Sequence, residues 1–115
     1  MPIDKQLMKG SMRTVVLQIL SKRPMHGYQI SQEIKSISDS RFSVTEGTLY
    51  PMLHALEADG ILTAELSVTS GNRKRKTYRL TDKGKEVLAK KKKEWVDFNN
   101  VMEGLIASYE ALGVS

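Results

Sequence analysis

The sequence predicts a mainly α-helical fold with one small β-hairpin and a long C-terminal helix. Three observations support this prediction. Apolar residues recur at helical spacing in three segments within residues 1–60. Two alternating segments then flank the turn residues TSGN at 69–72. From Thr81 onward the apolar residues keep a seven-residue spacing, which is typical of a helix that packs against another helix.

The composition is that of one compact domain: 115 residues, of which 40% are apolar and 27% are charged. No apolar run approaches the ~20 residues that cross a bilayer, so we expect no membrane partner. The N-terminal MPIDKQLMKGSM lacks the apolar block of a signal peptide. Cysteine is absent, which excludes disulfides and thiolate metal sites and fits a cytoplasmic location.

The first helix is predicted from about Asp4, as its N-cap, to Ser21, and Pro24 stops it. Its apolar residues share one helical face. They are Met8, Met12, Val15, Val16, Ile19 and Leu20.

Two further helices are joined by the polar turn 38–43. The second begins after Gly27, and its shared apolar face consists of Ile30, Ile34 and Ile37. The third begins near Thr45, a good N-cap residue, and ends at Asp59-Gly60. Its predicted buried residues are Leu49, Met52, Leu53 and Leu56.

A hairpin and a long helix complete the chain. ILTAELSV at 61–68 and RKRKTYRL at 73–80 are the predicted strands. Thr81 is a suitable cap for a last helix that runs to about Leu112. A helix of about 30 residues is ~45 Å long, more than the preceding domain can cover.

The apolar residues of the last helix form a heptad seam. The seam consists of Leu88, Trp95, Met102 and Tyr109, and of Phe98, Leu105 and Leu112, which lie three positions after the last three of these. Its far half needs a partner, and a second copy of the chain is the simplest one. We therefore expect a compact domain over residues 1–80 and a dimerisation helix over residues 81–115.

Positive charge is concentrated in one segment. Residues 73–93 carry eleven Lys and Arg against two acidic residues, whereas residues 94–115 carry four acidic residues and no basic one. A concentrated basic segment favours a polyanionic partner such as DNA. The alternative is a solvated helix face with scattered lysines.

Three helices followed by a hairpin with a basic tip are the plan of a winged helix-turn-helix domain. In this fold the third helix enters the major groove of double-stranded DNA by its N-terminal end, and the hairpin contacts the backbone. The residues expected to contact DNA are Thr45, Glu46, Thr48, Tyr50 and His54 on the third helix, Tyr28 and Gln29 on the second, and Asn72, Arg73, Lys74, Arg75 and Lys76 on the hairpin.

Strand alternation places Arg73 and Arg75 on one face of the hairpin and Lys74 and Lys76 on the other. The four side chains therefore cannot hold the same phosphates. Two alternative functions stay open. A winged-helix protein-interaction module would not need a basic hairpin, and a non-specific architectural protein would bind every duplex alike.

No pattern typical of an enzyme is present. The sequence shows no nucleophile–base pair, glycine-rich phosphate loop or paired acids in a cleft. His26 and His54 are the only histidines, and no cysteine accompanies them. We therefore expect no catalytic residue, no metal site and no cofactor.

Three stretches resemble the PadR family of bacterial transcriptional regulators: HGYQI at 26–30, GTLYPMLHALEADGIL at 47–62 and RKTYRLTDKGKEVL at 75–88. The resemblance implies a homodimeric winged-helix repressor that binds a pseudo-palindromic operator and responds to small molecules. The single C-terminal helix resembles the compact branch of the family, which includes multidrug-sensing members. Many members have proline where this chain has Glu46, so the family's base preference does not carry over.

The resemblance also implies a ligand pocket between two subunits. In similar multidrug-sensing regulators a tryptophan at the position of Trp95 pairs with its dimer mate, and two indoles can sandwich a planar hydrophobic or cationic compound. The implied lining residues are Leu7, Met8, Gly10, Thr14, Trp95, Phe98, Asn99 and Met102. The alternative is that Trp95 simply fills the seam.

Overall fold

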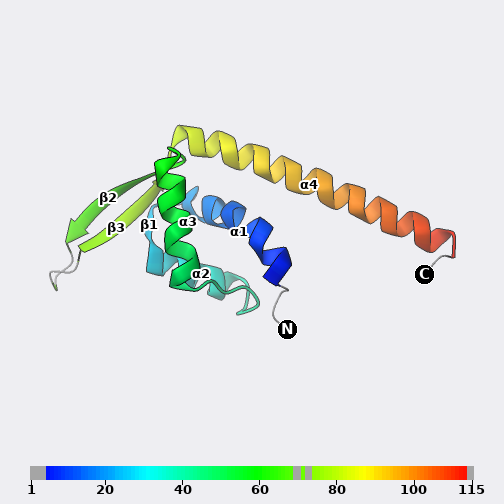
Figure 1. The fold of residues 1–115 in the computed structure, drawn as a ribbon, viewed down its shortest axis with the longest axis horizontal. Helices are drawn as coiled ribbons and strands as arrows, with labels where there is room; N and C mark the ends of the chain where they lie inside the picture. Colours follow the sequence, from blue (N-terminus) through cyan, green and yellow to red (C-terminus); the bar gives the residue numbers. More distant parts are fainter. Residues whose placement is uncertain (1–4, 69–70, 72–73, 114–115) are drawn as a thin grey trace.

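The fold is a small helical domain with a three-stranded sheet and one protruding helix (Figure 1). This computed structural model describes residues 5–68, 71 and 74–113, with side chains from residue 11 onward. Its elements are α1 (Lys5–Leu20), β1 (Met25–His26), α2 (Gly27–Ile37), α3 (Glu46–Ala58), β2 (Leu62–Val68), β3 (Lys74–Leu80) and α4 (Asp82–Ala111). The predicted mainly α-helical fold is confirmed. No helix in the described ranges is long and apolar enough to cross a membrane.

The sheet is antiparallel with strand order β1-β3-β2. The sequence predicts only the hairpin β2–β3, which forms the wing. It misses β1, in which Met25 pairs with Tyr78 and His26 pairs with Thr77. Two residues between Pro24 and Gly27 are too few to show a strand periodicity.

The core lies where α1, α2, α3 and the inner end of the sheet meet. Its largest fully buried side chains are Tyr78, Leu17, Ile30, Leu49, Leu53, Leu56, Leu62 and Val16. Gly60 ends α3 with a left-handed φ of 76°, as its glycine predicts. Ile37 differs from expectation: it is 71% exposed because α2 ends there and the chain turns away through Asp39 and Ser40, which both adopt positive φ.

Helix α4 begins in the core and then leaves it. The Thr81 hydroxyl caps the helix by accepting the N–H of Gly84 at 3.0 Å, and it also donates to the Gly60 and Ile61 carbonyls. Gly84 and Leu88 are buried, so residues 82–88 pack with the segment before residue 80. Past Leu88, α4 first runs beside α1, and only its C-terminal part extends beyond the other elements (Figure 1).

Candidate nucleic-acid interface

The N-terminal end of α3 presents polar side chains to solvent. Leu49, Leu53 and Leu56 anchor the opposite face of the helix in the core. Thr45 occupies the N-cap position, as predicted, but its hydroxyl donates to Thr48 Oγ1 at 3.2 Å instead of capping a backbone N–H. Both hydroxyls are therefore exposed and close together. A base edge or a phosphate can replace the hydrogen bond that they make with each other.

The other predicted residues of α3 have different environments. Glu46 and His54 are exposed, and Pro51 is exposed on the same side as His54. Tyr50 is half-buried and packs against Gly27 at the start of α2. The Tyr50 ring therefore packs within the domain, whereas its hydroxyl was expected to contact DNA.

The wing carries four described basic residues, of which three were predicted to contact DNA, and two of these three contact other elements. Lys76 Nζ lies 3.0 Å from Glu57 Oε1 on α3, and this hydrogen bond raises the pKa of the lysine. Arg75 lies 3.0 Å from His26 Nε2 at the start of α2. The predicted placement of Arg75 and Lys76 on opposite faces is confirmed. Lys74 is exposed; Asn72 and Arg73 fall outside the described residues.

The first turn of α2 is closed by a capping box. The His26 N–H donates to Gln29 Oε1 at 3.1 Å, and the Gln29 N–H donates to His26 Nδ1 at 3.2 Å. Gln29, predicted to contact DNA, thus has its side-chain oxygen engaged in the cap. Tyr28 is 55% exposed, and its ring stacks on His26 at a centroid distance of 6.5 Å. Burial, and then the charge of Arg75, lower the pKa of His26.

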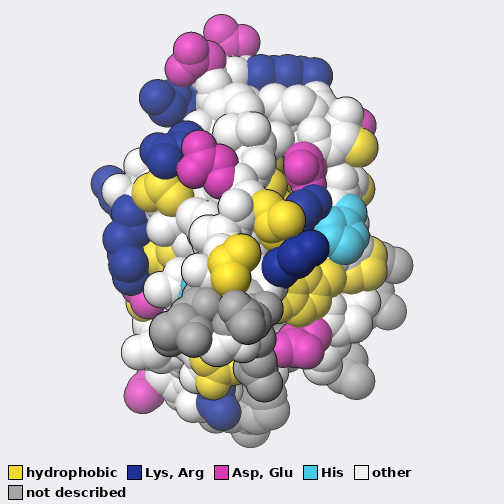
Figure 2. Space-filling view, turned by 90° about the vertical axis from the view of Figure 1, so that its left-hand side faces the viewer, with side chains coloured by type: hydrophobic (Ala, Val, Ile, Leu, Met, Phe, Trp, Pro, Cys, Tyr) yellow, Lys and Arg dark blue, Asp and Glu magenta, His cyan; other side chains and the backbone are white. Residues whose placement is uncertain are grey.

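The structure divides the basic segment 73–93 into two groups. The described basic residues at 74–76 and 79 belong to the wing, whereas Lys83, Lys85 and the run 90–93 lie on α4, which leads away from the wing (Figure 1). The view onto the wing end shows Lys and Arg side chains along the left edge and a second group right of the centre beside a histidine, with hydrophobic side chains between the two groups (Figure 2). Among the residues that the structure describes, the basic side chains therefore lie in separate groups.

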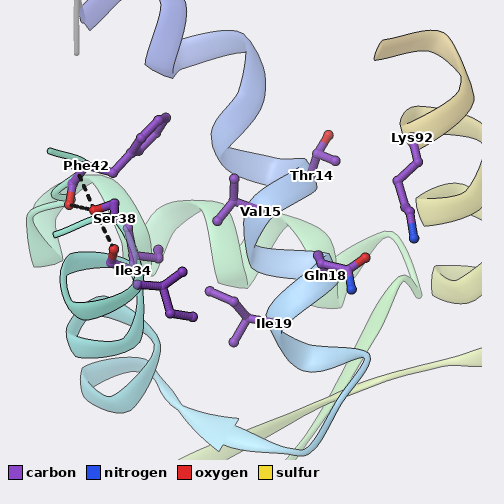
Figure 3. Close-up of a pocket in the computed structure, with 9 residues that line it drawn as sticks. Thr14, Val15, Gln18, Ile19, Ile34, Ser38, Phe42 and Lys92 are labelled. Carbon is purple, nitrogen blue, oxygen red and sulfur yellow. Dashed lines mark hydrogen bonds between the residues drawn. The ribbon is translucent and has the colours of Figure 1, made fainter. Parts of the chain in front are cut away.

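A second candidate site is an apolar hollow of about 530 Å³ between α1, α2 and the first half of α4 (Figure 3). It is lined by Thr14, Val15, Gln18, Ile19, Ile34, Ile37, Ser38, Phe42 and Lys92. Ser38 anchors the α2–α3 turn by donating to Ile34 O and accepting from Phe42 N. Gln18 Oε1 is buried and has no hydrogen-bond partner in the described part of the chain.

Of the predicted ligand-binding residues whose side chains the structure describes, this hollow includes only Thr14. Trp95, Phe98 and Met102 lie further along α4 and are exposed, and Asn99 donates to Glu103. Leu7, Met8 and Gly10 belong to α1, but their side chains fall outside the described residues. A single chain therefore does not enclose Trp95.

The exposed N-terminal end of α3 beside a basic hairpin defines a winged-helix protein of the DNA-binding class. The family model described as the transcriptional regulator PadR-like family matches residues 16–90. The chain belongs to this family, whose members are regulators and not enzymes.

Individual relatives agree with this family membership. The chain is 37% identical over 84 residues to the transcriptional regulator Rv3488 of Mycobacterium tuberculosis, covering 73% of this chain and 75% of that protein. A transcriptional regulator structure from Clostridium thermocellum has a TM-score of 0.81 at 26% identity, covering 87% and 97% of the two chains. The PadR-like regulator of Bacillus cereus has a TM-score of 0.75 at 29% identity, covering 89% and 97%.

Sequence reasoning missed two residues that the structure brings to this interface, His26 and Glu57. The signal for His26 was a polar residue three positions before Gln29, which is the spacing of a capping box. Its contact with Arg75 spans 49 residues and leaves no local pattern. The same holds for Glu57, which meets Lys76 across the α3–β3 contact.

Proposed function

We propose that this regulator is a dimeric repressor that binds a specific, pseudo-palindromic operator. One observation carries the proposal: the buried face of α3 leaves Thr45, Glu46 and Thr48 exposed at its N-terminal end, and Lys74 and Arg75 of the wing are exposed too. The helix supplies groups that read bases, and the wing supplies charge that holds the backbone. A repressor role, and not an activator role, follows the family resemblance.

The dimer is supported by the exposed apolar side of α4. Beyond Leu88, which is only 6% exposed and packs in its own chain's core, the predicted seam is open to solvent. Its members Trp95, Phe98, Met102, Leu105, Tyr109 and Leu112 are between 39% and 73% exposed. Such an apolar stripe is costly in water and is covered when two α4 helices pack together.

Two matched substitutions test the dimer. Leu105 and Val96 are both about half exposed on α4, but Val96 lies on the opposite side of the helix from the seam. Leu105→Glu is expected to give monomers in analytical ultracentrifugation, and Val96→Glu is expected to leave dimers. If the Leu105→Glu variant still forms dimers, the seam is not the dimer interface.

A small planar compound bound between Trp95 and its mate is the proposed signal that relieves repression. The indole is 54% exposed in one chain, so a second α4 is needed to close a site around it. Titration with a planar cationic dye is expected to quench Trp95 fluorescence in the dimer and to leave the Leu105→Glu variant unquenched. Absence of quenching in the dimer would mean that Trp95 fills the seam.

The two alternative functions predict different binding to DNA. A protein-interaction module predicts weak binding with little salt dependence, because it neutralises no phosphates. An architectural protein predicts the same affinity for every duplex. The specific repressor alone combines steep salt dependence with discrimination between duplexes.

A further inference from the structure

His26 has more hydrogen-bond donors around it than a neutral imidazole can satisfy. Its Nδ1 faces the backbone N–H of Gln29 at 3.2 Å, and its Nε2 faces a guanidinium nitrogen of Arg75 at 3.0 Å. Both neighbours are donors, and a guanidinium has no acceptor. A neutral imidazole has one lone pair and one N–H, so it can accept only one of the two bonds.

Neither tautomer satisfies both contacts. If Nδ1 keeps the lone pair, α2 stays capped, but the Nε2–H points at the Arg75 donor. If Nε2 keeps the lone pair, Arg75 is held, but the N–H of Gln29 loses its acceptor. Protonation removes the one remaining lone pair, so neither donor would have an acceptor, and burial together with the charge of Arg75 disfavours it.

The backbone fixes this arrangement. His26 pairs with Thr77 across the β1–β3 ladder, so the side chain of Arg75, two residues from Thr77, lies on the same side of the sheet as the imidazole. The Tyr28 ring stacks on the imidazole, and Arg75 is exposed. The conflict therefore lies at the surface, where an acceptor from outside can reach both donors.

We propose that His26 and Arg75 together bind one phosphate of the DNA backbone. A phosphate oxygen accepts from Arg75 and draws it away from the imidazole. The Nε2–H then donates to the same phosphate, while Nδ1 continues to cap α2 through Gln29. The inference rests on the proposed DNA-binding function. It adds His26 as an uncharged hydrogen-bond donor to the phosphate, which no charge pattern in the sequence indicates.

The ring nitrogens report the tautomer directly. In protein labelled with ¹⁵N histidine, duplex DNA is expected to convert His26 from a tautomer mixture to the Nε2–H form, with His54 as the internal reference. Arg75→Ala is expected to give the Nε2–H form without DNA, because the competing donor is gone. A mixture that DNA leaves unchanged overturns the proposal. The same shift with inorganic phosphate, at equal ionic strength, would assign the site to free phosphate instead.

Binding measurements test whether the two residues share one phosphate. Asn is also a good N-cap residue, so His26→Asn keeps a cap but removes the Nε2 donor. It is expected to weaken binding roughly three- to tenfold, on operator and scrambled duplex alike and with no change of salt slope, as for one neutral hydrogen bond. Arg75→Ala is expected to lower the slope by about one.

The double variant separates the outcomes. If both residues hold one phosphate, the fold-loss of DNA affinity in the double variant is smaller than the product of the fold-losses in the two single variants. If the two fold-losses of affinity multiply, the two residues do not share a phosphate. If a folded His26→Asn protein binds DNA with wild-type affinity, His26 has no role in binding. The proposed repressor function is unaffected in both cases. A wild-type protein that binds no duplex overturns the repressor itself, and the phosphate site with it.

Discussion

The ring of Tyr50 on α3 lies against Gly27 at the first position of α2, so closely that a Cβ at Gly27 would stand 2.6 Å from Tyr50 Cε1. The absence of a side chain at Gly27 therefore sets how near α2 and α3 approach. Because the wing's Arg75 contacts His26, which precedes Gly27, this approach also links α3 to the wing. The positions of both predicted DNA-contacting elements depend on it.

Gly27→Ala is expected to destabilise the fold by about 1–3 kcal/mol, because the new methyl group must displace a stiff aromatic ring. Urea unfolding at fixed protein concentration measures the cost. In a Tyr50→Ala background the same substitution is expected to cost much less, because the clash is gone. An equal cost in both backgrounds would mean that Tyr50 does not set the approach.

Gly84→Ala is expected to be more costly than Gly27→Ala. A Cβ at Gly84 would collide with the carbonyl oxygen of Ile61, which is backbone and cannot rotate away. Gly104→Ala is the matched control on the same helix, because a Cβ there meets nothing within 4 Å. It is expected to stabilise by roughly 0.5–1 kcal/mol through helix propensity. Equal effects of the two substitutions on the free energy of unfolding would contradict the close packing of α4 against the Ile61 backbone, which directly precedes β2.

Glu57→Gln is expected to tighten binding to any duplex and to steepen its salt dependence. Lys76 is half exposed and paired with Glu57 at 3.0 Å, so the acid competes with phosphate for the lysine. Because exposed ion pairs contribute little to stability, the free energy of unfolding should change little. Anisotropy titrations at several salt concentrations measure both quantities. Weaker binding of the variant would show that Lys76 acts only within the fold.

Acidification is expected to destabilise the protein through His26. Its pKa is lowered from 6.5 in the folded chain, first by burial and then by Arg75, so the unfolded chain binds a proton more readily. The stability contribution is therefore complete above pH 6.5 and is lost as the pH falls through the folded pKa. Tyr28 and Gln29 of α2 and Arg75 of β3 surround the imidazole. Urea unfolding between about pH 7.5 and 5.5 should show the loss, and His26→Asn should reduce it; an unchanged pH profile in the variant would contradict this origin.

Thr48→Ala is expected to lower affinity for the operator while leaving binding to scrambled DNA unchanged. The Thr48 hydroxyl is exposed and bonded only to Thr45 within the described contacts, so its removal costs the fold little. Its loss removes a group that reads bases, worth about 1–3 kcal/mol of discrimination when the contact is good. Competition binding with the two duplexes measures the ratio. An unchanged ratio of the two affinities would mean that Thr48 does not contact bases.

The repeating patterns of this sequence predicted its elements because helix and strand periodicities are local. Thr81 marked the start of the last helix and Asp59-Gly60 the end of the third, because a helix cap involves residues only a few positions apart. Contacts between distant segments left no such mark. The pairing of β1 with β3, the Glu57–Lys76 ion pair and the hollow between α1, α2 and α4 all arise from tertiary packing.

The candidate site was predictable in part for the same reason. The N-terminal end of α3 and the basic wing follow from element order and residue type. Leu88 illustrates the limit: its heptad spacing placed it on the dimer seam, yet the start of α4 packs on its own domain and buries it. Heptad spacing identifies an apolar side of a helix but not which chain covers it.

The central claim is that this chain is a sequence-specific DNA-binding regulator. Its most direct test is fluorescence anisotropy on duplex DNA from upstream of the chain's own gene, against a scrambled duplex, over a salt series. We predict a preference of about a hundredfold or more for the upstream duplex, together with an affinity that falls steeply as salt rises. Equal affinity for both duplexes, or no binding to either at low salt, would contradict the claim.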